Sequence, residues 1–233
     1  MSTLIIPDGK KTGCNVRSSK PGQWCPLFGE KVPTIPLGEW DELIGEVELR
    51  SCVTNVKDQD GIGSCATEST TQSLEIVRQL EGQEYVQLNP WSIYATTSGG
   101  RDQGSSIDEN LAFVQAHGIC PESVWPRSKG WSAKPSAEAM AVAAQYKIAE
   151  FYDIGTVEEV GTALLLGFPV VFGWSGHSCV LTQLRSTTVA EYCNSWAPTW
   201  GDQGFGTIKL SAINWSYGAF AVRTATINSK VQP

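Results

Sequence analysis

The chain has 233 residues with a formal net charge of −7; 41% of the residues are hydrophobic and 18% are charged. This composition is typical of a folded protein with a full core and excludes a disordered chain. An acidic surface repels phosphate backbones, and no apolar run reaches the roughly 18–20 residues of a membrane span, so we expect neither nucleic acid nor a membrane as partner.

The first 35 residues are rich in Gly, Pro, Lys and Ser and have little periodicity. We interpret residues 1–35 as an N-terminal arm and residues 36–233 as the folded domain. We expect the arm either to pack along the β lobe or to dock to a partner. Its start lacks the basic residues and continuous apolar core of a signal peptide, so the localisation stays unknown.

Helical signals dominate the first part of the domain. Four stretches combine helical periodicity with start and stop residues: 64–80, 106–117, 136–149 and 156–166. Ser64 is positioned to cap the first of them. Ser106 and Thr156 each begin a capping-box pattern that ends in a glutamate three residues later.

The period then changes to that of strands. Five stretches are rich in β-branched and aromatic residues between glycine-containing turns: 169–174, 177–184, 188–193, 205–210 and 219–226. Helices followed by antiparallel strands predict an α+β fold with two lobes. We expect the helical lobe at about 50–125 and the β lobe at about 126–226.

Cys65 follows a glycine-containing loop and starts the first predicted helix. The free N–H groups and positive end of a helix favour a thiolate over a thiol, although the dipole contributes only about 0.3–1 kcal/mol. Gln59, six residues earlier, is able to join the Cys65 N–H as an oxyanion hole. Taken singly, Cys65 is better explained as a structural residue and Gln59 as a polar turn residue; the combination of the two favours a catalytic role.

The chain has two histidines, His117 and His177. His117 lies in the last turn of a predicted helix, where a cation complements the helix dipole, and this explains it fully. His177 begins a predicted strand, and Asn194 follows another. An asparagine carbonyl can hold one ring nitrogen of His177 and leave the other facing a thiol, with Trp196 shielding that hydrogen bond from water. In the structural reading, Trp196 only fills the core.

Seven cysteines leave at least one unpaired within a monomer. Cys14 and Cys25 bracket part of the arm, and the sequence leaves open whether they are bridged. Cys179 and Cys193 lie in apolar strands, as small buried residues do. No Cys-x-x-Cys pair is present, so we expect no metal and no other cofactor.

Together these segments resemble the papain-like cysteine peptidases. The segment VTNVKDQDGIGSC at 53–65 resembles that family's nucleophile segment, and NSWAPTWGDQGF at 194–205 resembles its asparagine segment. The resemblance covers roughly residues 36–225. It implies a two-lobe fold with an active-site cleft between a helical lobe, whose central helix carries the cysteine, and a β-barrel-like lobe. It also implies Cys65 as nucleophile, His177 as base and acid, Asn194 as orienting residue and Gln59 as oxyanion donor.

The resemblance further suggests where a substrate binds. Gly104 and Ser105 align with the glycine pair that offers its backbone to a peptide. Further contacts by position are Ile107, Val170, Ser178 and Trp196.

The chain also departs from the family. Ala66 replaces an aromatic residue after the nucleophile, Ile62 replaces a disulfide cysteine, and Gly176 precedes the histidine. The arm is too short and too poor in helical signal for the usual propeptide. These departures remove no catalytic group.

We therefore predict a cysteine peptidase that hydrolyses peptide bonds through a thioester acyl-enzyme, with a peptide or protein substrate. One alternative is a catalytically weak or inactive papain-like module with a binding or structural role in a larger assembly. Another is an acyltransferase with an amine acceptor, whose third residue is usually Asp instead of Asn194.

Overall fold

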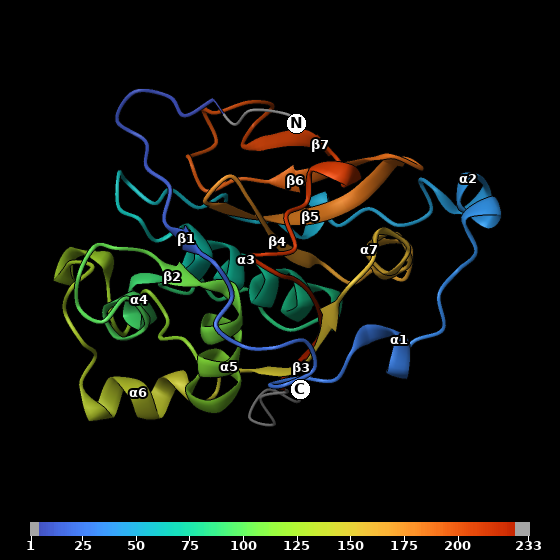
Figure 1. Cartoon of the computed structure of the whole chain (residues 1–233). Coiled ribbons are helices and arrows are strands. Elements are labelled where there is room, and N and C mark those ends of the chain that lie inside the picture. Colours follow the sequence, from blue (N-terminus) through green and yellow to red (C-terminus); the bar gives the residue numbers. More distant parts are fainter. Residues whose placement is uncertain (1–4, 227–233) are drawn as a thin grey trace.

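The computed structural model describes residues 5–226. A six-stranded antiparallel sheet, in the order β3-β8-β4-β5-β6-β7, lies beside the long helix α3. Figure 1 shows helices α4, α5 and α6 on the far side of α3, whereas α1, α2 and α7 lie on the side of the sheet. The helices are α1 (Phe28–Lys31), α2 (Trp40–Leu43), α3 (Cys65–Leu80), α4 (Trp91–Thr97), α5 (Ile107–His117), α6 (Ala137–Ala143) and α7 (Val157–Leu165). The strands are β1 (Cys14–Asn15), β2 (Ser105–Ser106), β3 (Ile148–Ile154), β4 (Val170–Trp174), β5 (His177–Ser186), β6 (Val189–Cys193), β7 (Phe205–Lys209) and β8 (Ala219–Ala225). Short 3-10 turns occupy Leu37–Glu39, Arg50–Cys52, Arg127–Lys129 and Leu210–Ala212.

The predicted α+β fold and the five predicted strands are confirmed. Of the helices, the prediction for 136–149 is wrong in extent, because α6 ends at Ala143 and strand β3 begins at Ile148. Ile148 pairs with Ala225 of β8, a partner 77 positions away in the sequence, and this long-range pairing decides the local structure. Helix α4 was not predicted from the sequence.

The two predicted capping boxes have different outcomes. At α7 the Thr156 side chain accepts a hydrogen bond from the Glu159 N–H at 3.1 Å, and Glu159 accepts one from the Thr156 N–H at 3.2 Å. At α5 the box is absent: Ser106 makes no capping hydrogen bond. Ser106 instead pairs in β2 with the N-terminal arm.

The sheet has a hydrophobic core on each face, as the period of two along a strand requires. In β4, Val171 packs with residues of α3 and α5. Its neighbours Val170 and Phe172 face the other way, into a core shared with α7 and Trp40. Both cores hold the sheet against its helices.

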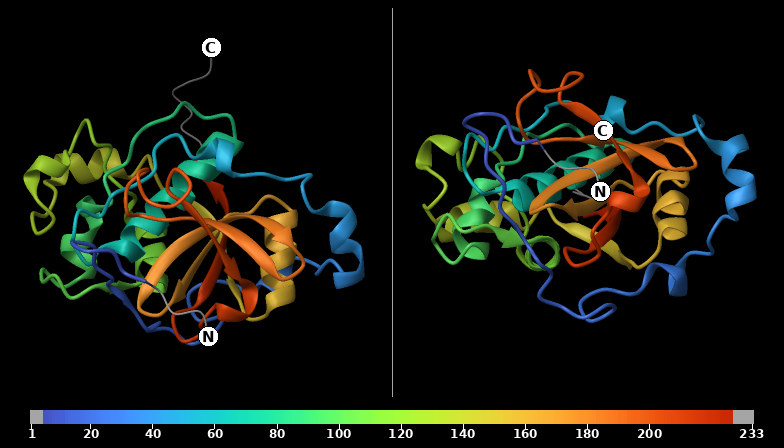
Figure 2. Two further views of the ribbon diagram at one scale, coloured as in Figure 1. Left: turned by 90° about the horizontal axis from the view of Figure 1, so that it is seen from above. Right: turned by 45° about the horizontal axis from the view of Figure 1, so that its top comes forward.

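The N-terminal arm packs along both the helical side and the sheet side of the domain. In Figure 2 the arm is the blue segment. Strand β1 pairs in parallel with β2, and the Cys14 N–H donates to the Gly176 carbonyl at 2.8 Å, just before β5. Farther on, the buried Phe28 packs edge-on against Tyr152 of β3. Within residues 5–226, none of the helices has the length and apolar character needed to cross a membrane.

Candidate active site

Cys65 is the first residue of the 16-residue helix α3 and is fully buried. The helix begins there because the preceding loop turns through Gly61, whose φ of 71° is in the left-handed region that glycine tolerates best. No side chain caps this end. The predicted cap by the Ser64 side chain is therefore wrong. The Ser64 carbonyl instead accepts from the Thr67 and Glu68 N–H groups, each at 2.9 Å, which leaves the N–H groups of Cys65 and Ala66 for the thiol or for a ligand beside it.

His177 and Asn194 are brought together by neighbouring strands. His177 is the first residue of β5 and Asn194 follows β6, and their side chains meet with His177 Nε2 2.7 Å from Asn194 Oδ1. The Ser195 N–H also donates to that oxygen, at 2.8 Å, which identifies Oδ1 as an acceptor. Nε2 therefore carries the ring proton, and Nδ1 presents a lone pair.

Two observations single out Nδ1 of His177. It is buried, and no hydrogen-bond partner for it exists in the described part of the chain. Trp196 stacks on the ring at 4.6 Å between centroids, which fixes the ring plane and shields the bond to Asn194. Trp196 is itself buried, so it acts on the histidine and has no free surface for a substrate.

The side-chain amide of Gln59 is oriented by two neighbours. Its Oε1 accepts from the Ser195 hydroxyl at 2.8 Å, and its Nε2 donates to the Ile62 carbonyl at 2.6 Å. The second hydrogen of Nε2 donates to the carbonyl of Lys11, in the arm, at 2.9 Å. The amide is thus aimed at a backbone carbonyl, as the predicted oxyanion donor should be.

The arm covers these groups. The Gly13 N–H donates to the Cys65 sulfur at 3.2 Å, and the Gly13 carbonyl accepts from the Ser105 N–H at 3.0 Å. A Cβ at Gly13 would lie only 2.1 Å from the Gly63 carbonyl oxygen, so only glycine fits this close approach. In this conformation the arm is an occupant of the site.

Burial by the arm and the core keeps both candidate catalytic groups neutral. Burial raises the pKa of Cys65 to about 11, against the opposing effect of N–H groups of Ser178, Gly13 and Ala66. Burial lowers the pKa of His177 to about 4, against the opposing effect of the hydrogen bond with Asn194. Both shifts favour a neutral thiol at Cys65 and a neutral imidazole at His177.

The predicted substrate positions divide into two groups. Gly104 and Ser105 do meet an extended chain, the arm, and Ile107 lies beneath them in the same core as Cys65. Ser178 places its N–H near the Cys65 sulfur, but its hydroxyl bonds Ser69 of α3 at 2.7 Å.

Val170 is not brought to the site. It faces the second core of the sheet, because it alternates with Val171. Gly173 of the same strand lies nearer the arm, since a Cβ there would be 3.4 Å from the Cys14 sulfur.

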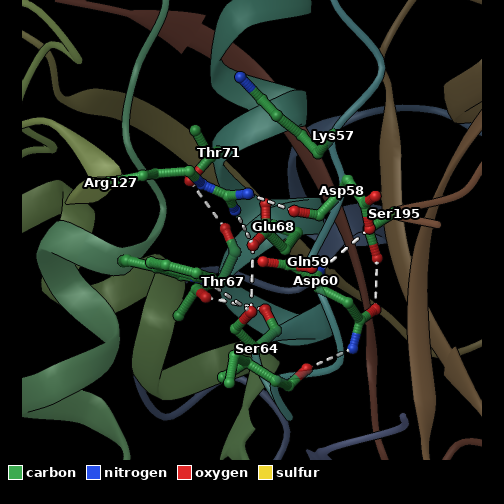
Figure 3. Close-up of polar contacts among 12 residues, drawn as sticks. Lys57, Asp58, Gln59, Asp60, Ser64, Thr67, Glu68, Thr71, Arg127 and Ser195 are labelled. Carbon is green, nitrogen blue, oxygen red and sulfur yellow. Dashed lines mark hydrogen bonds and ion pairs between the residues drawn. The ribbon is translucent and has the colours of Figure 1, made fainter. Parts of the chain in front are cut away.

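A polar network that the sequence did not reveal joins the two segments carrying Gln59 and Cys65 (Figure 3). The Arg127 guanidinium bonds both the Asp58 carbonyl and the fully buried carboxylate of Glu68, in the first turn of α3. Ser64 also donates to Glu68, at 3.0 Å. This network holds the Gln59 loop against the helix that starts at Cys65.

In residues 5–226, no group of three or more His, Cys, Asp or Glu side chains is arranged to hold a metal ion, and all seven cysteines are free, Cys14 and Cys25 included. A basin of about 860 Å³ lies over β6 and β7 beside Trp174 and Lys209. None of the four candidate catalytic residues lines it.

No protein-family model matches the sequence, and no curated protein matches it significantly. Solved structures do match. Xylellain, a cysteine protease from Xylella fastidiosa, has a TM-score of 0.73 at 18% identity over 96% of this chain and 99% of its own. Digestive procathepsin L 3 from the Tenebrio molitor larval midgut has 0.63 at 18% identity, over 78% and 69%. A Carica candamarcensis cysteine protease has 0.62 at 17% identity, over 76% and 98%.

These structures share the arrangement of a helix-rich side and an antiparallel sheet that the sequence predicted. The similarity covers nearly all of this chain in the case of xylellain. The chain therefore has the papain-like fold.

Proposed function

We propose that the chain is a cysteine peptidase in which Cys65 is the nucleophile and His177 the acid and base. The observation that carries the proposal is the pairing of His177 Nε2 with Asn194, which leaves Nδ1 buried and unpaired. The N–H of Ser178, the residue after His177, reaches the Cys65 sulfur, so the strand that carries the histidine adjoins the thiol. The papain-like fold and its cysteine-protease neighbours support the same reaction.

The proposed reaction has two halves. His177 Nδ1 takes the thiol proton, and the Cys65 sulfur forms a bond to the scissile carbonyl carbon while the carbonyl electrons move to oxygen. Gln59 Nε2 and the Cys65 N–H stabilise that oxyanion. The C–N bond then breaks, and the leaving amine takes the proton from His177.

Water completes the cycle. His177 Nδ1 accepts a proton from the water as its oxygen attacks the thioester carbon. The C–S bond breaks, the carboxylic product leaves, and the proton returns to the sulfur. The balance is one peptide bond and one water consumed, with one acid and one amine formed.

Turnover requires the arm to leave the site, because Cys65 is fully buried under it. A second candidate function follows from the same fact. If the arm never leaves, the neutral pair of Cys65 and His177 is inert and the chain is a binding or structural module.

The test is hydrolysis of a mixed fluorogenic peptide library by the full chain and its Cys65→Ala variant. We expect Cys65→Ala to abolish turnover while leaving the circular dichroism and the melting temperature unchanged. Cys52→Ala is the matched control, since Cys52 is a free, half-buried thiol outside the site. Turnover that survives Cys65→Ala would contradict the assignment.

Labelling with a thiol-directed epoxide peptide separates the two candidate functions. Stoichiometric modification of Cys65 that is lost in His177→Ala supports the peptidase. Labelling of Cys65 no faster than that of Cys52 supports the inactive module.

A further inference from the structure

The loop ahead of β2 carries a carboxylate that points at the candidate active site. Asp102 Oδ1 accepts from the Gly63 N–H at 2.8 Å and from the Tyr94 hydroxyl at 2.9 Å. Gly63 lies two residues before Cys65, so this oxygen ties the loop to the nucleophile segment. Asp102 is thereby held in one orientation.

The other carboxylate oxygen is turned to the arm. Asp102 Oδ2 forms an ion pair with Lys11 Nζ. The Asp102 side chain is 20% exposed and the Lys11 side chain 45% exposed, so the carboxylate is partly shielded from water whereas the lysine lies nearer the surface. Although partial burial acts to raise it, hydrogen bonds from Lys11, Gly63 and Tyr94 hold the pKa of Asp102 below its usual value. The carboxylate is therefore charged and preorganised for a cation.

Lys11 thus contacts the site twice. Its backbone carbonyl accepts from Gln59 Nε2 at 2.9 Å, and its ammonium group is bound by Asp102. The residue that presents its carbonyl to the predicted oxyanion donor is the same residue whose side chain reaches the carboxylate. A ligand that presents its carbonyl to Gln59 places its own side chain within reach of Asp102.

The arm is held as an occupant and not in the geometry of attack. Within residues 5–226, the Cys65 N–H makes no hydrogen bond to the Lys11 carbonyl, and the sulfur accepts from Gly13 instead. The arm therefore shows which side chain Asp102 binds, although the Lys11 carbonyl lacks the hydrogen bond from the Cys65 N–H that an attacked carbonyl requires.

We propose that Asp102 is a specificity-determining residue of the candidate active site and selects peptides with Lys or Arg at the position whose carbonyl faces Gln59. The inference deepens the proposed peptidase function and rests on it, because the carbonyl that faces Gln59 is the scissile one only if the chain is a peptidase. A charge-assisted hydrogen bond to a partly buried carboxylate predicts a preference of about 10- to 100-fold over an uncharged side chain of the same length.

The test compares two matched peptides, one with lysine and one with norleucine, which keeps the four-carbon stem and lacks the ammonium group. Affinities are measured by competition against a fluorescent lysyl peptide on the full chain carrying Cys65→Ala and Lys11→Met. Lys11→Met removes the arm's own ammonium group from Asp102. A ratio measured within one protein cancels the fraction of molecules in which the arm is displaced.

We expect the lysyl peptide to bind about tenfold or more tightly, and the added substitution Asp102→Asn to bring the ratio close to one. Asn keeps an oxygen for Gly63 and Tyr94, and Asp102→Glu should restore part of the preference. Circular dichroism and melting temperature check the fold of each variant.

Three outcomes overturn the inference: a ratio near one with Asp102 intact, a ratio unchanged by Asp102→Asn, or no binding of either peptide. Hydrolysis by the protein with Cys65 is scored separately. A lysyl preference in binding without any Cys65-dependent hydrolysis would leave the basic subsite standing and reject the peptidase.

Discussion

A methyl group at Gly13 should expose the candidate nucleophile. In Gly13→Ala the new Cβ would lie 2.1 Å from the Gly63 carbonyl oxygen and 2.5 Å from its carbon. Both are backbone atoms, and the Gly63 N–H is fixed to Asp102 at 2.8 Å, so the loop is poorly able to move aside. The arm is the part that must shift.

The size of the effect follows from the contacts that hold the arm over Cys65. Four hydrogen bonds link the segment 11–14 to Gln59, Cys65, Ser105 and Gly176, at 2.8–3.2 Å. Each contributes about 0.5–1.5 kcal/mol net, and overpacking by one methyl group costs about 1–3 kcal/mol. A loss of about 2 kcal/mol in arm docking corresponds to a roughly 30-fold larger open population.

The assay is the rate of iodoacetamide labelling of the folded protein, with each cysteine quantified by mass spectrometry. Cys65 should label about 30-fold faster in Gly13→Ala, since labelling passes through the open state. Cys52 is half-buried outside the site and serves as the internal reference. Gly38→Ala is the matched control, because a Cβ there meets no atom within 4 Å.

An unchanged Cys65 rate in a folded Gly13→Ala protein would refute the reasoning. It would mean that the arm does not control access to the thiol. Equal acceleration of Cys65 and Cys52 would instead indicate general unfolding, which near-ultraviolet circular dichroism would reveal.

Two further predictions concern stability, each measured by urea unfolding. Arg127→Met should cost about 3 kcal/mol, because it removes the ion-pair partner of the fully buried Glu68 carboxylate and leaves only the more distant charge of Lys57. A cost no larger than that of Lys129→Met, in the same 3-10 turn, would contradict this reasoning. The second prediction concerns His177, whose pKa in the folded protein is about 4, below the ordinary 6.5. Because the unfolded state binds the proton at a higher pH than the folded state, the contribution of the neutral His177 to the free energy of unfolding is complete above pH 6.5. It is lost as the pH falls toward 4, by an amount on the order of 3 kcal/mol. His177→Phe should flatten that part of the pH dependence, and equal slopes for both proteins would disprove the attribution.

Local sequence determined the elements that carry the site. The helix start at Cys65 depends on a glycine-containing turn and on the periodicity that follows, and both lie within a few residues. The strands that begin at His177 and end before Asn194 depend on β-branched and aromatic residues between turns. Short-range sterics and side-chain period decide such features, so a single sequence reveals them.

Long-range pairing decided the features that the sequence did not reveal. Strand β3 forms because Ile148 pairs with Ala225 of β8. Val170 does not contact the site, because the alternation of side chains along β4 places it in the other core of the sheet. The Arg127–Glu68 pair joins residues 59 positions apart. Periodicity carries no information about such partners.

The arm is the clearest case of this difference. Its composition predicted only an extended segment, and a glycine followed by a cysteine gives no signal of its destination. Its course over Cys65 depends on contacts that exist only once the loop at Gly63, the strand at Ser105 and the turn at Gly176 have come together. The sequence by itself determined which groups are able to do chemistry; the tertiary structure decided that they are covered, because access depends on what packs above them.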